Sequence, residues 1–337
     1  MLQLLCRGRC LHRPAISQQR LRRPIIIRPR LGQHIHEFRV NIAAVCNKHV
    51  LRHLGGQLVG HGQLQLEHIA AQVAGILADA GATVYADDAS TRRLSCKGVV
   101  QTQEIPPDTQ AILVIGGDGS ILDIAPMAME RDLPLIGVNL GRLGYLAEVA
   151  KGDIALLTRL VSGDYTLSER MTLSPAIVRV DGANTLPEIA FNEVAITHEN
   201  NLGLCDLLLT DSDGNRIRYR GDGLVIATPS GSTAYSFSCG GPVMHPDLSA
   251  ICVTPICPHS FFNRSMILSG DTEVTVECGG NSTKSYVSLD GRNTYLLHSG
   301  EKLCVRRGDR RLKMITFEKH GMMNTLREKM QEAELKD

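Results

Sequence analysis

A short apolar run that ends in a glycine-rich turn constrains the fold of this chain more than any other feature of its sequence. Residues 111–115 are all apolar, and the sequence GGDGS follows directly at 116–120. An apolar run of this length without polar alternation is typical of a strand that is covered on both faces, as in a parallel sheet between helices. The glycines then permit a tight turn into a helix over residues 120–129. The sequence therefore predicts an α/β layer in this region.

The surrounding segments divide the chain into four predicted parts. Strands near residues 40–45, 83–86 and 135–138, with a helix near 66–77, predict a Rossmann-like parallel sheet in an α/β domain over residues 38–160. Short alternating strands then predict a β-rich, sandwich-type domain that would carry part of a binding site over residues 161–318. Residues 319–337 are predicted to form a helix that packs back on the first domain. Residues 1–36 hold eight Arg and no Asp or Glu, so we expect a disordered or non-native extension over residues 1–37.

Charge and composition narrow the function classes. The net charge of +1 becomes −7 without the eight N-terminal arginines, because 28 basic residues then face 35 acidic ones. A mildly acidic body lacks the basic face that nucleic-acid binding needs. No apolar run is long enough to span a bilayer. Ten cysteines without a CxxC pair indicate reduced thiols in a cytoplasmic protein, with organelle import through the arginine-rich N-terminus as the alternative.

The turn at 116–120 combines a phosphate cradle with a carboxylate. It lies at the carboxyl end of a predicted strand, where open α/β sheets bind ligands, and the following helix N-terminus adds positive partial charge. We therefore expect four of its residues to contact the phosphates of a ligand: Gly116, Gly117, Gly119 and Ser120. Asp118 would repel phosphate unless it binds a metal or accepts a proton, and both are useful in phosphoryl transfer to a hydroxyl. A tight strand-to-helix turn with an Asp cap is the structural alternative.

A second segment rich in glycine and hydroxyls begins about a hundred residues later. Residues 220–236 read RGDGLVIATPSGSTAYS, so an acidic glycine turn enters an apolar strand and the strand leaves into a polar loop with one aromatic ring. Neutral hydrogen bonds and a stacking surface suit an adenosine site. Two shorter candidates accompany it. The pair Asn192-Glu193 fits a ribose diol or a base edge, whereas the sequence DGR at 290–292 also fits a plain type I′ hairpin turn.

Taken together, these segments closely resemble the NAD kinase family. The matching text is GGDGS at 116–120, IGVNLGRLGYLAE at 136–148, NEV at 192–194, GDGLVIATPSGSTAYSFSCGGPV at 221–243, TPICPHS at 254–260 and LDGR at 289–292. GGDG is shared with diacylglycerol and sphingosine kinases, whereas the TPSGSTAYS block after NEV is far more specific. Arg292 stands where the family usually has Gln, and Ser120 and Ser230 stand where it usually has Thr.

The resemblance implies a phosphotransferase that moves the terminal phosphoryl of ATP to the 2′-hydroxyl of the adenosine ribose of NAD, giving NADP. It also implies Mg²⁺ or another divalent metal, and a homodimer or homotetramer. Asp118 is then the proton acceptor at the 2′-hydroxyl, and no residue is singled out as a metal ligand. The positions implied for the dinucleotide are Gly119, Asn192, Glu193, Arg220, Asp222, Thr233, Ala234, Tyr235, Ser236, Ser238 and Arg292.

Two other functions stay open at this point. A lipid kinase of the diacylglycerol or sphingosine type would share GGDG, but it would also carry a membrane-facing patch that the sequence does not show. A catalytically silent sensor would bind the dinucleotide without turnover, and the intact Asp118 argues against it. The NAD kinase hypothesis requires Asp118 and the segment near Thr233 to face one crevice between the two domains.

Overall fold

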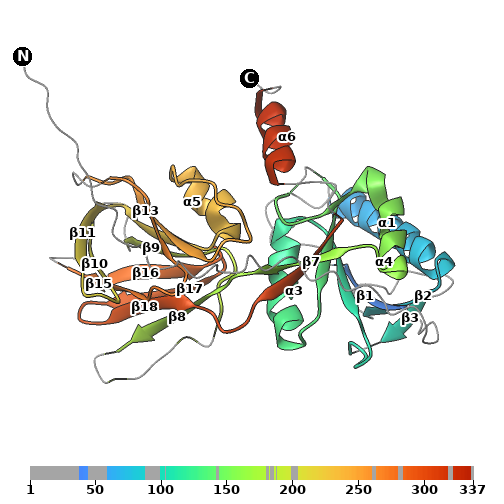
Figure 1. Ribbon diagram of the computed structural model, residues 1–337, viewed down its shortest axis with the longest axis horizontal. Helices are drawn as coiled ribbons and strands as arrows, with labels where there is room; N and C mark the ends of the chain where they lie inside the picture. Colours follow the sequence, from blue (N-terminus) through green and yellow to red (C-terminus); the bar gives the residue numbers. More distant parts are fainter. Residues whose placement is uncertain are drawn as a thin grey trace, which may run out of the picture.

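The chain forms an α/β body and a β-sandwich, which are joined by the strands β7 (Thr166–Arg170) and β19 (Leu312–Thr316) (Figure 1). The computed structural model describes residues 38–44, 59–87, 99–102, 104–141, 144–179, 182, 186, 188–198, 204–259, 263–279, 284–317 and 322–334. The predicted extension over residues 1–37 lies outside the described residues.

The sheet of the α/β body is parallel over most of its width. Its strands follow the order β3-β2-β1-β4-β5-β19-β7, with β6 paired to β5. Only β7, at the edge, runs antiparallel to its neighbour β19. The first six strands in chain order are β1 (Phe38–Ala44), β2 (Ala82–Asp87), β3 (Val99–Thr102), β4 (Ala111–Ile115), β5 (Leu135–Asn139) and β6 (Val149–Ala150).

Helices cover both faces of this sheet. The core on one face includes residues of α1 (Val59–Asp79), η2 (Lys151–Leu157) and α4 (Thr158–Ser162), and α3 (Asp118–Glu130) packs on the other face. Along β4, Leu113 contributes to the α1 core, whereas Ile112 and Val114 contribute to the α3 core. Both faces of β4 are therefore dry, which explains why its sequence shows no polar alternation.

The β-sandwich consists of two antiparallel sheets. The five-stranded sheet has the order β11-β10-β15-β18-β8, and the six-stranded sheet has the order β14-β13-β12-β9-β16-β17. Alternate residues of both sheets meet in one large apolar core. The bounds of the first sheet are β8 Leu173–Val178, β10 Cys205–Asp211, β11 Arg216–Gly221, β15 Val274–Cys278 and β18 Lys302–Arg307. Those of the second are β9 Glu193–His198, β12 Gly223–Ala227, β13 Ala250–Ile256, β14 Met266–Ser269, β16 Lys284–Leu289 and β17 Asn293–His298.

The outer face of the six-stranded sheet carries a second apolar layer. Val225 and Ala227 of β12 pack there with Cys252 of β13 and with Met244. The short helices η3 (Ser230–Thr233) and α5 (Tyr235–Ser238) follow β12 directly. As a result every residue of β12 and β13 is buried, and the chain after β12 emerges at the side of the sandwich that faces the α/β body (Figure 1).

The predicted fold class, an α/β domain with a parallel sheet followed by a β-rich domain, is confirmed. The strands β7 and β19 fall inside the range 161–318 that was assigned to the second domain, but they belong to the sheet of the first. The chain leaves that sheet through β7, builds the sandwich and returns through β19. The last helix, α6, runs over Met322–Glu334. Among the described residues, none of the helices combines the length and the apolar character that crossing a membrane requires.

Candidate active site

Asp118 begins helix α3 and points across to a neighbouring loop. The turn before it follows β4 directly, and its backbone is tied to β5 by a hydrogen bond from the Gly116 N–H to the Val138 carbonyl (2.9 Å). The two carboxylate oxygens of Asp118 accept the backbone N–H groups of Tyr145 (2.8 Å) and Leu146 (3.2 Å). Two hydrogen bonds to rigid backbone fix the side chain in one orientation, and each carboxylate oxygen keeps lone-pair capacity for a further partner.

Gly144 explains how the loop approaches Asp118 so closely. A Cβ atom built on Gly144 would overlap the Asp118 carboxylate oxygen Oδ1. Only glycine therefore lets the backbone come near enough to donate both N–H groups. Beside it, burial and the negative charge of Asp118 raise the pKa of the Tyr145 phenol, so the hydroxyl of Tyr145 stays protonated.

The turn after β12 forms the opposite wall of the site. Thr228 ties this turn to the segment before β9: its hydroxyl donates to the Phe191 carbonyl (2.7 Å), and its N–H donates to the Asn192 carbonyl (2.8 Å). The same hydroxyl accepts the N–H of Gly231 (3.0 Å). A Cβ on Gly231 would overlap the backbone of Asn192, so this crossing of two chain segments also requires glycine.

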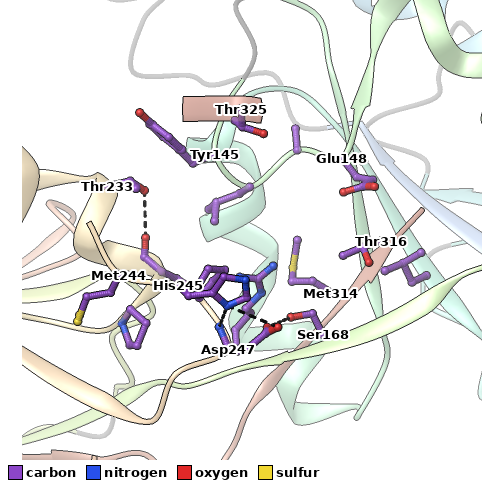
Figure 2. Close-up of a pocket in the computed structure, with 17 residues that line it drawn as sticks. Tyr145, Glu148, Ser168, Thr233, Met244, His245, Asp247, Met314, Thr316 and Thr325 are labelled. Atoms are coloured by element: carbon purple, nitrogen blue, oxygen red, sulfur yellow. Dashed lines mark hydrogen bonds and ion pairs between the residues drawn. The ribbon is translucent and has the colours of Figure 1, made fainter. Parts of the chain in front are cut away.

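A cavity of about 210 Å³ separates the two walls. Tyr145 and Leu146, which hold Asp118, line it from the α/β body, and Ser230 and Thr233 line it from the sandwich (Figure 2). The remaining lining residues are Ala147, Glu148, Ser168, Arg170, Pro229, Met244, His245, Pro246, Asp247, Met314, Ile315, Thr316 and Thr325. The loop that fixes Asp118 and the segment near Thr233 thus face one crevice.

On the sandwich side of this crevice, three buried polar atoms have no hydrogen-bond partner among the described residues. They are Oδ1 of Asn192, Oε2 of Glu193 and Oγ of Ser230. A fourth, Nε of Arg170, belongs to another residue of the cavity lining. Leaving such an atom without a partner costs about 1–3 kcal/mol. Three of them within two neighbouring segments indicate a surface that is completed by a polar ligand.

The buried carboxyl of Glu193 is protonated more readily than a free glutamate. Burial and the nearby Asp290 carboxylate raise its pKa from 4.5 to about 8, against the opposing effect of a hydrogen bond from the Tyr235 N–H. At neutral pH the side chain is therefore mostly the neutral acid, which offers one donor and one acceptor.

Asp290 lies in the turn between β16 and β17 and holds the strand end that carries Glu193. Its carboxylate accepts three backbone N–H groups, from Phe191 (2.8 Å), Asn192 (2.7 Å) and Glu193 (3.0 Å). Positive φ at Asp290 (51°) and Gly291 (65°) fits the predicted type I′ hairpin turn. The strand register pairs Leu289 with Asn293, so the loop holds three residues where a plain type I′ hairpin has two. The side chain of Asp290 adds a contact that a plain turn does not need.

Comparison with known proteins assigns the family. Residues 25–165 match the ATP-NAD kinase N-terminal domain, and residues 191–317 match the ATP-NAD kinase C-terminal domain. The NAD kinase of Acetivibrio thermocellus is 35% identical over 252 residues, which are 74% of this chain and 87% of that protein. The NAD kinase of Geotalea daltonii is 32% identical over 249 residues, 72% of this chain and 86% of that protein. The chain belongs to the NAD kinase family.

Solved structures show the same fold. Yeast NADH kinase in complex with NADH aligns with a TM-score of 0.68 at 20% identity, covering 87% of this chain and 86% of the yeast chain. An NAD kinase from Archaeoglobus fulgidus in complex with ATP aligns with a TM-score of 0.60 at 22% identity, covering 86% and 99%. Family membership makes this chain a phosphotransferase, and neither the lipid kinase nor the silent sensor gains support from these comparisons.

Of the positions that the family resemblance implied for the dinucleotide, only Thr233 lines the cavity itself. Tyr235 lies beside it on α5, partly exposed, and its pKa is raised by burial and by charges that include Asp222 and Glu193. Ser236 has a different role, because its buried hydroxyl is hydrogen-bonded to that of Thr254 (2.9 Å) and holds α5 on β13. Ala234, before α5, is half-buried, whereas Ser238 at the end of α5 is exposed.

The acidic turn before β12 approaches two strands closely. A Cβ on Gly221 would lie 2.7 Å from the Ile256 carbonyl oxygen, and one on Gly223 would overlap the Ile196 carbonyl. Between these glycines, Asp222 lies 4.0 Å from Nε2 of His198. Arg220 is exposed, and its carbonyl accepts the N–H of His259 (2.7 Å).

The remaining predicted residues of the glycine turn differ in exposure. Gly117 is exposed, Gly116 is buried, and Gly119 is half-buried in the first turn of α3. Ser120 is buried within α3 at 3% exposure, and its N–H donates to the Gly117 carbonyl (2.9 Å). The exposed edge of this turn therefore consists of glycine backbone.

Sequence reasoning missed the polar group on the far side of the cavity. Ser168 of β7 donates a hydrogen bond to Asp247, and His245 lies 3.8 Å from the same carboxylate (Figure 2). Burial lowers the pKa of Arg170, and the negative charges of Asp247 and Glu148 partly offset this lowering. Only Glu148 lies in a sequence block that the family resemblance used. The others come from separate strands and loops, and no local pattern connects them.

The described residues contain no cluster of three or more His, Cys, Asp or Glu side chains that could hold a metal ion. Mg²⁺ in phosphoryl-transfer sites is normally held by one or two carboxylates together with substrate phosphates. A metal that arrives with ATP would be held mainly by the ATP phosphates, which leaves the Asp118 carboxylate available as a proton acceptor.

Proposed function

We propose that this chain phosphorylates the 2′-hydroxyl of the adenosine ribose of NAD, with ATP as the donor, in the crevice between the loop at residues 145–148 and η3. One observation carries the proposal: the loop that fixes the Asp118 carboxylate and the Ser230–Thr233 turn line the same cavity. A phosphoryl acceptor bound in this cavity would lie next to the loop whose N–H groups hold the Asp118 carboxylate.

In this proposal Asp118 is the proton acceptor. The ribose O–H bond breaks, its proton passes to a carboxylate oxygen of Asp118, and the ribose oxygen forms a bond to the terminal phosphorus as the bond to the ADP oxygen breaks. The two N–H groups from Tyr145 and Leu146 hold the carboxylate in place before the reaction. Little else is needed chemically, since positioning and charge stabilisation dominate phosphoryl transfer.

The unpartnered atoms of the sandwich supply recognition of the acceptor. The neutral Glu193 acid can donate and accept, and Asn192 and Ser230 each hold a buried oxygen whose missing hydrogen bond a ligand could supply. Tyr235 offers an exposed aromatic face for stacking. This combination suits an adenosine, whose base and ribose present both donors and acceptors.

The donor side consists of the glycine turn and α3. Backbone groups of Gly116, Gly117 and Gly119, with the positive end of α3, suit the ATP phosphates. Mg²⁺ or another divalent metal, when bound with ATP, neutralises charge on the transferred phosphoryl. We also propose a cytoplasmic homodimer or homotetramer, on the strength of the family resemblance alone.

Replacement of Asp118 tests the proposal. We expect Asp118→Asn to lower NADP formation from NAD and ATP by about 10²–10⁴-fold, the usual size of a general-base effect. Asp213→Asn, in an exposed turn between β10 and β11, is the matched control and should leave the rate unchanged. Activity of Asp118→Asn within about threefold of the parent would refute the role of Asp118. Parallel assays with diacylglycerol, in which we expect no product, separate this function from the lipid kinase alternative.

A further inference from the structure

The hairpin turn at 290–292 contacts both bodies of the molecule. On one side, Asp290 accepts the N–H groups of residues 191–193, and its own N–H donates to the Glu193 carbonyl (3.0 Å). On the other side, the Arg292 guanidinium donates to the carboxylate of Asp123 and to the carbonyl of Gly119, both in α3. The turn therefore connects the strand end that carries Glu193 to the helix that carries Asp118.

We propose that Arg292 is a positioning residue, which sets the orientation of the first turn of α3 relative to the Asn192–Glu193 strand end. The proposal rests on the proposed function, in which these two segments hold the acceptor ribose between them. It assigns to Arg292 a contact with protein and not with the dinucleotide, in contrast to the expectation from the family resemblance.

The turn is rigid enough to couple the position of Arg292 to that of the strand end at Glu193. Its backbone is closed by the hydrogen bond from the Arg292 N–H to the Leu289 carbonyl (2.9 Å). Positive φ at two successive residues leaves the turn few alternative conformations. Three hydrogen bonds on the Asp290 carboxylate then fix the turn to the β9 strand end, so the Cα of Arg292 moves with Glu193.

The Arg292 side chain fixes the orientation of α3 relative to the strand end, which apolar packing alone cannot do. Phe191 packs in the same apolar core as Ile121 and Ala125 of α3, but such contacts tolerate rotation of one body on the other. A planar guanidinium that bridges a carboxylate and a carbonyl has a narrow geometry, which lysine cannot reproduce. Since Gly119 follows Asp118 in the helix, a shift at its carbonyl moves the Asp118 carboxylate.

The contact is exposed enough to contribute little to stability. The side chains of Arg292 and Asp123 are 30% and 40% exposed, and exposed ion pairs add little to the free energy of unfolding. Catalysis is far more sensitive, because a misplacement of about 1 Å can cost up to 10²-fold in rate. Loss of the pair should therefore appear in kcat and not in the melting temperature.

Kinetics of three variants test the proposal. Arg292→Met keeps the apolar stem and removes the donors, so we expect kcat for NADP formation to fall about tenfold with KM for NAD changed less than twofold. Asp123→Asn should lower kcat in the same direction, and the double variant should be no slower than Arg292→Met within about twofold, because both remove one interaction. Arg292→Lys should recover only part of the loss.

Arg218→Met is the matched control. Arg218 makes an equivalent two-point contact with Asp206, but both residues lie in the same sandwich sheet, so kcat should not change. A kcat for Arg292→Met within twofold of the parent would overturn the proposal. So would a rise in KM with kcat unchanged, because that pattern identifies direct contact with the dinucleotide. Failure of the proposed function appears separately, as an active Asp118→Asn variant.

Discussion

Glu193 allows a quantitative test of the electrostatics of the site. The folded protein raises the pKa of this carboxyl from 4.5 to about 8, because burial and Asp290 disfavour the charged form. The native state thus binds the proton more tightly than the unfolded chain. Its contribution to the free energy of unfolding is fully present below pH 4.5, declines as the pH rises through the interval, and is lost above about pH 8.

The size of the effect follows from the two pKa values. Each pH unit inside the interval lowers the free energy of unfolding by up to about 1.4 kcal/mol. Between about pH 5 and pH 8 the loss from this one group amounts to about 3 kcal/mol. Glu193→Gln keeps the shape of the neutral acid but cannot titrate, so the variant should lack this part of the pH dependence.

Urea unfolding of the parent and Glu193→Gln, followed by circular dichroism from pH 5 to pH 8, measures the difference directly. We expect the parent to lose stability relative to the variant steadily across this range. Glu130→Gln, at the exposed end of α3, is the control and should run parallel to the parent. If the difference between the parent and Glu193→Gln changes by less than about 1 kcal/mol over the range, Glu193 is not a buried neutral acid.

The other predictions concern two glycines where a side chain would clash and one buried hydroxyl that lacks a hydrogen-bond partner. Gly144→Ala places a methyl group on the Asp118 carboxylate, so we expect a folded protein with kcat lowered about tenfold or more, whereas Gly152→Ala, which has open space at its Cβ, should match the parent. Ser230→Ala removes an unpartnered hydroxyl, and isothermal titration should show NAD affinity about two- to tenfold weaker while the melting temperature without ligand does not fall. Gly231→Ala forces a Cβ into the backbone of Asn192, and denaturant unfolding should show a loss of about 1–3 kcal/mol.

The sequence predicts the parts of this fold that depend on local patterns. The apolar run at β4 and the alternating strands after residue 165 identify both bodies, because burial on both faces leaves a continuous apolar run and burial on one face leaves an alternating one. Strand β13 was not predicted from the sequence. It is buried along its whole length and shows no alternation, and it includes Pro255, which argues against a strand. Strand β7 is similarly obscured, because its mixed polar sequence lies at the edge of the sheet and shows no apolar face.

The contacts that form the site join residues that are far apart in the sequence, so local patterns do not predict them. Arg292 and Asp123 are 169 positions apart, and Asp290 reaches amides 97–99 positions away. Nothing in the local sequence of DGR distinguishes an ordinary hairpin from one that joins two bodies, because the turn geometry is the same in both cases. The glycine at 144 is a similar case, since the reason for it is a carboxylate 26 residues earlier in the chain.

Three carboxyl groups within this site differ in role because their hydrogen bonds and burial differ. Asp290 has three backbone N–H partners and serves as an anchor for the strand end. Glu193 is buried, keeps one oxygen without a partner, and is neutral at pH 7, so it can donate to a ligand. Asp118 has two N–H partners, one on each oxygen, and is held by the loop that lines the cavity. Only this last arrangement combines a fixed carboxylate with remaining acceptor capacity beside the crevice, which is what removal of a proton from a ribose hydroxyl requires.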